Sequence, residues 1–557
     1  MTPFLFLAPF LCLFWWVRTA KFILFYFYLW QLKEYHIGRF LDHFRTEKGK
    51  KLIFNRIVFL KIALLCYFLF FPYLFDYLKD LNLPEFSLLA FYFFFPSSAL
   101  IIYLFEFLKT GKDLFKKQAK FPKPTKKIVF LVIFSLICET FMVFGIFSLD
   151  ELNSFTFWLL TIDLLIPFIV SIIVLSFQPF AVIFRSQIII MAKRKREKLK
   201  DLLVIGITGS YGKTSTKEFL YRILSKKFRV LKTSERQNSE IGISQCILNE
   251  LTPEYDIFIV EMGAYGRRGI KLLCNIVKPH VGILTGINEQ HLALFGSQKN
   301  IIRTKYELIE SLPKDGLAIF NGSDKYCLEL YDKTEKPKRI FTSQPRVLGI
   351  EPDVWAENII VQKEFVFFRG CDKDGCDNFK AYLSGSHFVS NLLGAICVAT
   401  ELGMKKEEIS QSVLDIDAPR RTMNIFKGLN DLIIIDDSYS ANPQGVIAAL
   451  DYLKIYDGKK LIVMPCLIEL GLASREIHKS IGRKIGEICD AAIITTRDYF
   501  QEIREGAVEK GLKNEEILFS ENPSEILNTI QTFFYSGDAI LFAGRVPQKI
   551  IDNLIAK

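Results

Sequence analysis

Residues 208–216, Thr-Gly-Ser-Tyr-Gly-Lys-Thr-Ser-Thr, have the types and spacing of a phosphate-binding loop. In such a loop the glycines let backbone N–H groups curl around an anion, and the lysine, Lys213, reaches the terminal phosphates. The hydroxyl of Thr214 is placed to ligate Mg²⁺, although the loop is shorter than the common G-x-x-x-x-G-K-[ST] form. The residues expected to bind the nucleotide here are Gly209, Ser210, Gly212, Lys213, Thr214 and Ser215.

The segments on either side of this loop predict a strand before it and a helix after it. Residues 202–207 (LLVIGI) form a short apolar run typical of a buried parallel strand. Residues 217–228 (KEFLYRILSKKF) follow the loop with a helical pattern. A bound phosphate would lie at the N-terminus of that helix, where backbone N–H groups are available. The order strand, loop, helix therefore favours nucleotide binding over a structural turn.

Glu261 and His291 each follow an apolar run that reads as a strand, 256–260 and 281–285. Parallel strands bring their carboxyl ends to the same edge of a sheet, so both side chains are expected near Lys213. Carboxylate oxygen is a hard metal ligand and imidazole a borderline one. Taken alone, Glu261 could be a surface acid and His291 a packing residue. Their shared position predicts metal ligands, with Thr214, Glu261 and His291 as the set.

The chain is far more apolar before residue 190 than after it. Half of its 557 residues are hydrophobic, 52 of them are Phe, and the mean hydropathy is +0.24. Crossing a bilayer takes about 20 apolar residues in a helix. A membrane domain fused to an α/β protein is therefore predicted, with about five spans. The candidate spans are roughly 4–30, 53–78, 86–108, 128–149 and 155–184.

The net charge of +11 is concentrated in three short stretches, 31–52, 109–127 and 193–200. These stretches hold 20 Lys and Arg against 5 Asp and Glu, a surplus larger than the net charge of the whole chain. The rest of the chain is therefore slightly negative, and it offers no basic surface for a nucleic acid. The loops between them, 79–85 and 150–154, are short and neutral to acidic. Lys and Arg in short loops stay in the cytoplasm. The alternation predicts a multi-pass protein of the cell inner membrane, with its N-terminus outside and its catalytic domains in the cytoplasm.

Three carboxylates, Glu106, Glu139 and Asp163, fall in or near the predicted spans. Burying a carboxylate in a bilayer is costly, which makes such residues candidates for function. Glu106 is close enough to a helix end to reach the membrane interface. For Glu139 and Asp163, contact with a lipid-linked substrate and simple pairing between helices both stay open.

The 11 cysteines are scattered along the chain. The closest pair, Cys371 and Cys376, lies in a turn rich in Gly and Asp. Metal-ligand spacing with histidine partners is absent, so reduced, buried or incidental thiols are expected.

Several segments in the soluble half resemble the central domain of the Mur ligases, which are ATP-dependent amide-forming enzymes of peptidoglycan-precursor synthesis. The sequence of residues 436–443 (DDSYSANP) is similar to that of the branch that adds D-alanyl-D-alanine (MurF-type). Residues 469–471, followed by His478, also resemble that branch. The resemblance covers about 200–557. The matching segments of the central domain are 208–218, 238–242, 261–270, 285–297, 304–310 and 321–324.

The resemblance implies a mechanism with ATP and Mg²⁺. In the family a substrate carboxylate attacks the γ-phosphate to give an acyl phosphate, and an amine then displaces phosphate. Lys213 and Arg421, or Arg420, would neutralise the transferred phosphoryl group. Glu261 and His291 would hold a second Mg²⁺, in addition to the one at Thr214.

Further residues take their expected roles from the same resemblance. Lys305 aligns with a lysine that is carbamylated in some branches, and an unmodified lysine on a helix stays open. Family positions that contact adenine or ribose correspond to Asn321, Asp324 and Asn391, and to Asp437 or Asp436 in the last domain. Tyr439 and Asn442 could instead be turn and capping residues.

Four regions are predicted: a transmembrane helical domain over 1–190, a basic linker over 191–200, a P-loop Mur ligase central domain over 201–422, and a Rossmann-like C-terminal domain over 423–557. The last domain is predicted because short apolar strands alternate there with helical segments. The membrane spans stand where MurF-type ligases have a small UDP-binding domain. The acceptor is therefore either a UDP-linked peptidoglycan precursor held by other surfaces or a lipid-linked peptide.

Two other functions remain open. The first is another acid–amino acid ligase of the same superfamily, of the poly-γ-glutamate or pseudomurein type. The resemblance of residues 436–443 to the D-alanyl-D-alanine branch disfavours it. The segments 464–467 and 543–545 depart from the branch in the domain that would choose the amine, which is an amino acid or a dipeptide. A membrane transport ATPase would also combine spans with a P-loop. No ABC-like signature motif supports it.

Overall fold

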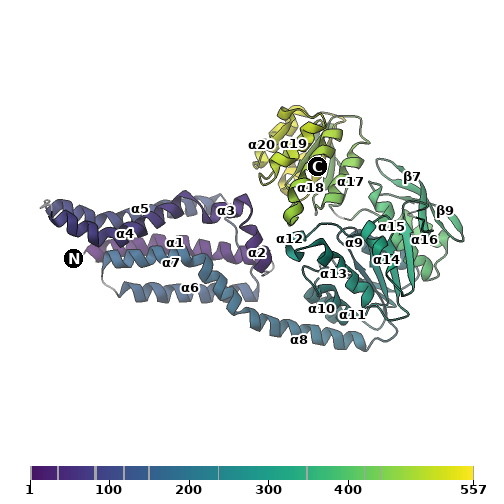
Figure 1. Cartoon of the computed structure of the whole chain (residues 1–557), viewed down its shortest axis with the longest axis horizontal. Helices are drawn as coiled ribbons and strands as arrows, with labels where there is room; N and C mark the ends of the chain where they lie inside the picture. The colour runs from purple at the N-terminus through teal and green to yellow at the C-terminus, as the bar shows by residue number, and fades with distance from the viewer. Residues whose placement is uncertain are drawn as a thin grey trace. The chain divides into compact units, whose positions relative to one another are not determined.

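The computed structural model describes residues 3–33, 35, 37–80, 85–116, 119–148, 151–235, 237–346, 349–419, 421–439 and 441–555. The chain forms two compact units, Met1–Phe184 and Arg185–Lys557 (Figure 1). The first is called the helical unit, and the second, which holds the predicted phosphate-binding loop, is called the catalytic unit. The predicted limits of the separate domains stay predictions.

The helical unit consists of long apolar helices joined by short connections (Figure 1). Five helical segments in the described residues are long and apolar enough to cross a membrane, in agreement with the predicted number of spans. These segments are Phe6–Leu32, Gly49–Phe70, Tyr92–Phe115, Lys126–Phe147 and Leu152–Glu197. The helices are α1 (Pro3–Leu32), α2 (Ile37–His43), α3 (Glu47–Ile53), α4 (Arg56–Asp80), α5 (Glu85–Phe115), α6 (Lys126–Phe147), α7 (Leu152–Ser176) and α8 (Gln178–Glu197), the last of which continues into the catalytic unit.

A buried group of four charges joins α1, α4, α5 and α7. Lys61 lies 2.5 Å from both Glu106 and Asp163, and Arg18 pairs with the same two carboxylates. Pairing between helices is therefore the observed role of Asp163. The expectation that Glu106 reaches the interface is wrong, because it is 8% exposed and its carboxylate is used inside this group. Glu139 is 2% exposed, and neither of its carboxylate oxygens hydrogen-bonds to a described residue.

The first part of the catalytic unit is built on a sheet that has nine strands in the described residues. Its strands are β1 (Leu203–Thr208), β2 (Val230–Lys232), β3 (Ile257–Glu261), β4 (Val281–Leu284), β5 (Leu317–Asn321), β6 (Lys338–Thr342), β7 (Val354–Val361), β8 (Val366–Asp372) and β9 (Gly375–Ala381). They are ordered β2-β3-β1-β4-β5-β6-β7-β8-β9. The pairs up to β7 are parallel, and β7, β8 and β9 pair antiparallel. The predicted α/β class is confirmed.

Both faces of the parallel strands are buried, which explains why they read as continuous apolar runs. Alternate residues of β1 face opposite sides, as a strand period of two requires. Ile205 packs in the core with α9 and α15, whereas Val204 packs with α10, α11 and α13. The helices of this part are α9 (Lys213–Leu224), α10 (Glu240–Asn249), α11 (Gly269–Val277), α12 (Leu292–Phe295), α13 (Gln298–Glu310), α14 (Lys325–Asp332), α15 (His387–Glu401) and α16 (Lys406–Leu414).

The C-terminal part has a six-stranded sheet in the described residues, and the predicted doubly wound arrangement is confirmed. Its strands are β10 (Asn424–Lys427), β11 (Ile433–Asp437), β12 (Lys460–Met464), β13 (Ala491–Ile494), β14 (Ile517–Phe519) and β15 (Ala539–Ala543), ordered β10-β11-β15-β12-β13-β14. Only β10 pairs antiparallel among them. The short strands β10 and β14 were not predicted. The helices are α17 (Pro443–Leu453), α18 (Ser474–Ile488), α19 (Phe500–Glu509), α20 (Pro523–Phe533) and α21 (Gln548–Leu554).

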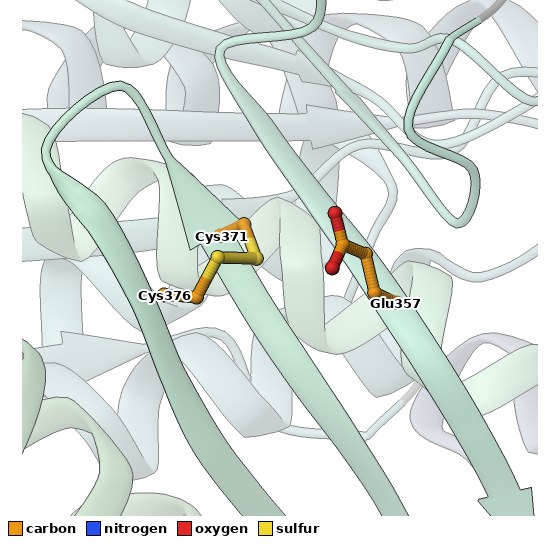
Figure 2. A group of neighbouring side chains, drawn as sticks. All are labelled: Glu357, Cys371 and Cys376. Atoms are coloured by element: carbon orange, nitrogen blue, oxygen red, sulfur yellow. A yellow bond between two sulfur atoms is a disulfide. The ribbon is translucent and has the colours of Figure 1, made fainter.

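The hairpin of β8 and β9 carries a disulfide between Cys371 and Cys376, which lie directly opposite each other (Figure 2). The expectation of reduced thiols is therefore wrong for this pair, because register places the two side chains together. Glu357 on β7 lies beside the disulfide, and the three ligand-type atoms are within 4.8 Å of one another. Metal-binding cysteine is a thiolate, so the bonded sulfurs are not available as ligands.

Candidate active site

The phosphate loop connects the buried end of β1 to the start of α9. Atoms close to its two glycines leave no room for a side chain at either position. A Cβ on Gly209 would lie 2.1 Å from the Thr285 hydroxyl, and one on Gly212 would lie 2.5 Å from Asn391 Oδ1. Gly212 also has φ of 77°, a left-handed conformation that favours glycine. The sequence context of strand, loop and helix is confirmed.

Lys213 is the first residue of α9, and its ammonium group curls back over the loop. Its Nζ donates hydrogen bonds to the carbonyls of Gly209, at 2.7 Å, and Ser210, at 3.2 Å. Burial lowers the pKa of Lys213, while the nearby carboxylate of Glu261 opposes this shift. The ammonium group is thus held at the loop by neutral carbonyls, and no carboxylate of the described residues forms an ion pair with it.

Glu261 ends β3, is 5% exposed, and is held from both sides. Thr214 Oγ1 donates to its Oε2 at 3.1 Å, and Asn238 Nδ2 donates to its Oε1 at 3.2 Å. Burial alone would raise the pKa of Glu261, but the charges of Lys217 and Lys213 and the Asn238 hydrogen bond outweigh it and lower the pKa. The structure therefore brings the predicted metal ligands Thr214 and Glu261 into direct contact.

Lys217 is a site residue that the sequence reasoning missed. It lies one helical turn after Lys213, is 0% exposed, and places its Nζ 3.3 Å from Glu261 Oε2 and 3.4 Å from Glu218 Oε1. Glu218 also pairs with Lys232. The spacing of four residues from Lys213 was the available signal, because it places both ammonium groups on one face of the helix.

His291 follows β4 in a left-handed backbone conformation, with φ of 66°. Its Nδ1 lies 2.5 Å from Glu469 Oε2, and the ring of Tyr265 meets it edge to face. Burial lowers the pKa of His291, the Glu469 carboxylate raises it, and the charges of Lys305 and Lys213 lower it further. The charge of Lys213 thus acts on both Glu261 and His291.

Glu469 comes from the C-terminal part and was predicted only as part of a branch motif. Its carbonyl accepts a hydrogen bond from Ala293 N, so backbone and side chain both meet the His291 loop. His478 shapes the Glu469 loop. The Nε2 of His478 accepts from Leu467 N, and its Nδ1 contacts the Ser474 carbonyl at 2.6 Å. Both ring nitrogens of His478 are therefore engaged in structural bonds.

Lys305 lies on α13 and is 4% exposed. Burial, with the charge of Lys213, lowers its pKa to about 7, although Glu307 and Glu261 raise it. An amine with a pKa near 7 is substantially neutral at physiological pH. The neutral form is the one that adds to CO₂, so the environment suits carbamylation.

The predicted adenine and ribose contacts in this part are engaged in structural bonds. Asp324 caps α14 with Oδ1, and its Oδ2 accepts from Tyr211 OH at 3.0 Å and from Ile287 N at 3.1 Å. Asn321 donates to the Thr285 carbonyl. These two residues tie the phosphate loop to the loop after β4.

Asn391, on α15, lies against the phosphate loop, where its Oδ1 accepts from Thr216 Oγ1 at 3.4 Å. Asp437 ends β11 and is 8% exposed; burial, together with Asp436, raises its pKa. Asn442 caps α17, which confirms the capping alternative.

Arg421 is exposed and has a left-handed φ of 56°. Its carbonyl accepts from Tyr439 N, but its guanidinium makes no hydrogen bond or ion pair to the described residues. Arg420 lies outside the described residues. The contact of Arg421 with the phosphates stays a prediction.

The assembled site has the composition of an anion receptor. Lys217 pairs with Glu261 at the carboxyl edge of the sheet, and the charges of Lys213 and Lys305 also act with this carboxylate. Positioned cations of this kind are what phosphoryl transfer requires, because the transferred group spreads negative charge over its oxygens. Fold and site together define a P-loop enzyme that acts on a nucleotide.

Comparisons with known proteins specify the family. The Mur ligase middle domain matches residues 207–399, and the Mur ligase glutamate ligase domain matches residues 421–546. The UDP-N-acetylmuramoyl-tripeptide–D-alanyl-D-alanine ligase of Synechocystis sp. is 32% identical over 342 residues, covering 61% of this chain and 71% of that protein. The enzyme of the same name from Bacillus subtilis is 27% identical over 358 residues, covering 63% and 76%.

Solved structures agree with this assignment. MurF from Acinetobacter baumannii superposes with a TM-score of 0.60 at 27% identity, covering 66% of this chain and 80% of that one. MurF ligase from Thermotoga maritima in complex with ADP shares the fold, with a TM-score of 0.58 at 24% identity and coverage of 66% and 83%. The chain belongs to the Mur ligase family. It is an ATP-dependent amide ligase, and its first 206 residues precede the matched domains.

Proposed function

We propose that this ligase joins an amine to the carboxylate of a peptidoglycan-precursor peptide through an acyl phosphate, with D-alanyl-D-alanine as the amine. The names of its relatives in Synechocystis sp. and Bacillus subtilis support the substrates. The observation that carries the chemistry is the contact of Thr214 with Glu261 beside the ammonium groups of Lys213 and Lys217.

Two substitution steps make up the reaction. A carboxylate oxygen of the acceptor attacks the γ-phosphorus of ATP, and the bond to ADP breaks. The amine nitrogen then attacks the acyl carbon, the carbon–oxygen bond to phosphate breaks, and the nitrogen loses a proton. Lys213 neutralises charge on the transferred group, for which it exchanges its contacts with the Gly209 and Ser210 carbonyls.

The oxygen and nitrogen donors of the predicted metal ligands are of types that can bind Mg²⁺. Thr214 offers a hydroxyl, Glu261 an ionised carboxylate, and His291 the ring nitrogen not engaged with Glu469. Bound there, Mg²⁺ would screen the repulsion between the acceptor carboxylate and the triphosphate. Lys305, carbamylated, would add a further oxygen donor. Arg421, which is exposed in this structure, would neutralise the transferred phosphoryl group.

The remaining predicted residues are those expected to lie near the base and the sugar of the nucleotide. Asn321, Asp324 and Asn391 act mainly by shaping the loops around the phosphates, given the bonds they already make. Asp437 offers a carboxylate from the C-terminal part for the ribose. Glu469 couples the two parts, because it binds the His291 loop through side chain and backbone.

The catalytic unit acts at the cytoplasmic face of the inner membrane, with the N-terminus of the chain outside. The five apolar helical segments and the alternating loop charges support this placement. The acceptor is then either a UDP-linked peptide or a lipid-linked one presented at the bilayer. Confinement of a lipid-linked acceptor and the enzyme to one surface would raise their effective concentration.

The test is product analysis by mass spectrometry after incubation of the full chain in membranes with ATP, Mg²⁺, D-alanyl-D-alanine and either a UDP-linked or a lipid-linked tripeptide. Amide product with stoichiometric phosphate release, dependent on both acceptor and amine, is expected. Phosphate release that needs neither would overturn the ligase and favour a transport ATPase. Product with one acceptor alone identifies the natural one.

A further inference from the structure

Three side chains at the antiparallel edge of the first sheet have the types and positions of metal ligands. Cys371 on β8, Cys376 on β9 and Glu357 on β7 each offer one ligand atom, and these atoms lie within 4.8 Å of one another (Figure 2). In the sheet, β4, β5 and β6 stand between β7 and β1, the strand that leads into the phosphate loop. The group is therefore separate from the candidate active site.

The group lies on the face of these strands that is turned away from the hydrophobic core. Ala356 and Phe368 pack in the core, and residues an odd number of positions away along a strand face the other side, as Glu357 and Cys371 do. Cys371 is 1% exposed, whereas Glu357 and Cys376 are half-buried. An ion can therefore reach the group from solvent, while one of its ligands is already shielded from water.

The hairpin of β8 and β9 keeps the two cysteines opposite each other without the bond between them. Its loop has only two residues, 373–374, and the ladder pairs residues on both sides of the cysteines. Lys406 Nζ donates to Asp372 Oδ1 and to the Gly375 carbonyl, which fixes the loop. The Cα atoms of the cysteines are 4.0 Å apart. Two sulfurs on one tetrahedral Zn²⁺, each about 2.3 Å from the ion, lie about 3.8 Å apart, which a directly opposed pair can span.

Glu357 is held as a metal ligand would be. Trp355 Nε1 donates to its Oε1 at 2.9 Å, which fixes the carboxylate plane and leaves the second oxygen for an ion. Carboxylates that ligate metals are held by outer hydrogen bonds of this kind. Two thiolates and one carboxylate carry one negative charge more than a divalent cation neutralises. Arg369 is exposed and directly opposite Glu357 in the ladder, so it brings a positive charge beside the group.

The sulfur ligands select the metal. Cysteine thiolate suits Zn²⁺, whereas Mg²⁺ and Ca²⁺ prefer oxygen donors. Two thiolates and a carboxylate supply three of the four positions of tetrahedral Zn²⁺, and a water fills the fourth. Because a disulfide offers no thiolate, the ion and the sulfur–sulfur bond exclude each other.

We propose that, once the disulfide is reduced, Cys371, Cys376 and Glu357 bind one Zn²⁺ ion that ties β7, β8 and β9 together. A dithiol reductant breaks the sulfur–sulfur bond by giving two electrons and two protons, and it becomes a disulfide itself. Zn²⁺ then displaces the two thiol protons as it binds. A reducing compartment, such as the proposed cytoplasmic location, favours the reduced form. The zinc site goes beyond the ligase reaction and does not depend on it.

The test uses the full chain in detergent, freed of metal and kept anaerobic with a phosphine reductant. Competition with a chromogenic zinc indicator gives the stoichiometry and the affinity, and Co²⁺ in place of Zn²⁺ reports thiolate ligation through its charge-transfer absorption. The parent is compared with Cys376→Ser, with Glu357→Gln, and with the matched control Cys66→Ser, which removes an exposed cysteine of the helical unit. Circular dichroism checks that each variant is folded.

The reduced parent and Cys66→Ser are each expected to bind one Zn²⁺ more per chain than the oxidised parent, with the thiolate–Co²⁺ band. Cys376→Ser should lose the band and bind about 100-fold more weakly, and Glu357→Gln should bind about 10-fold more weakly with the band retained. Absence of additional Zn²⁺ in the reduced parent, or binding that folded Cys376→Ser leaves unchanged, would overturn the site. If Cys376→Ser does not fold, Glu357→Gln decides, because an unchanged affinity there would also overturn the proposed ligand set.

Discussion

The helical unit and the catalytic unit each bury a group of charged side chains. In the helical unit two cations, Arg18 and Lys61, pair with two carboxylates, Glu106 and Asp163. In the catalytic unit the charges of three lysines, Lys213, Lys217 and Lys305, act with the carboxylate of Glu261, while Lys217 also pairs with Glu218 and Glu307 acts on Lys305. Every charge of the first group has an ion-pair partner, whereas Lys213 and Lys305 in the second group form no ion pair with a described residue. The two groups are called balanced and unbalanced for this reason.

The difference shows what each group is for. Buried charges are costly unless they are paired, and the balanced group meets that requirement within the protein. In the unbalanced group Lys213 and Lys305 have no ion-pair partner among the described residues, and burial lowers the pKa of both. An arriving triphosphate and acceptor carboxylate would supply the missing negative charge. The cost of holding like charges together is thereby offset on binding.

The largest expected effect is on Lys213 in the unbalanced group. Lys213→Ala removes the cation at the phosphate loop, and ATP-dependent product formation should fall about 10³-fold or more. Steady-state phosphate release and product mass measure this. Insertion in the membrane should be unchanged, as shown by carbonate extraction. Retention of full activity would remove Lys213 from the site.

Lys61→Met tests the balanced group. Glu106 and Asp163 would lose one of the two cations that they share, and breaking a buried pair from one side costs about 3–5 kcal/mol. Thermal unfolding of the full chain in detergent should show the loss, with ATP turnover at low temperature retained. The matched double variant Lys61→Met with Glu106→Gln should recover part of the stability. A loss of turnover without a loss of stability would contradict a structural role for this group.

Glu261→Ala separates metal binding from nucleotide binding in the unbalanced group. Acyl-phosphate formation should fall about 10²-fold, whereas the affinity for ATP should change much less, because the phosphate loop remains. Trapping of the acyl phosphate by hydroxylamine and equilibrium binding of an ATP analogue measure the two. Asn238→Ala, which removes a hydrogen bond to the same carboxylate, serves as a milder control. Equal losses of both properties would contradict the assigned role of Glu261.

The pKa of Lys305 predicts a smaller, pH-dependent effect. Its folded pKa is about 7, against 10.5 for free lysine, so between these values the unfolded chain binds more protons. Stability should therefore rise with pH from about 7 to about 10, and Lys305→Met should flatten this slope. Denaturant unfolding at a series of pH values measures it. If carbamylation occurs, added bicarbonate should raise activity of the parent chain but not of Lys305→Met.

The limits of sequence reasoning differ between the two groups as well. The phosphate loop was predictable because strand, loop and helix are contiguous, and the local pattern specifies all three. The burial of Glu106 was not predicted, because its position near a helix end does not reveal its partner Lys61, which lies 45 residues earlier in the chain. The contact of Asp324 with the nucleotide stays a prediction, and the four hydrogen bonds that it accepts, from positions near and far in the chain, were not predicted.

The disulfide and the His291–Glu469 contact show the same limit. Cys371 and Cys376 are five residues apart, yet only the register of β8 and β9 decides that they face each other. His291 and Glu469 are 178 residues apart and belong to different parts of the catalytic unit. A pattern within one segment cannot specify either pairing.

By itself, the sequence determined the apolar spans, the P-loop and the order of strands and helices, because each depends on the hydrophobic period and composition of a short segment. The tertiary structure alone decided which buried charges form ion pairs and which do not. Electrostatic interactions act between side chains that folding brings together from distant segments, and the balance of a buried group exists only once its members are assembled.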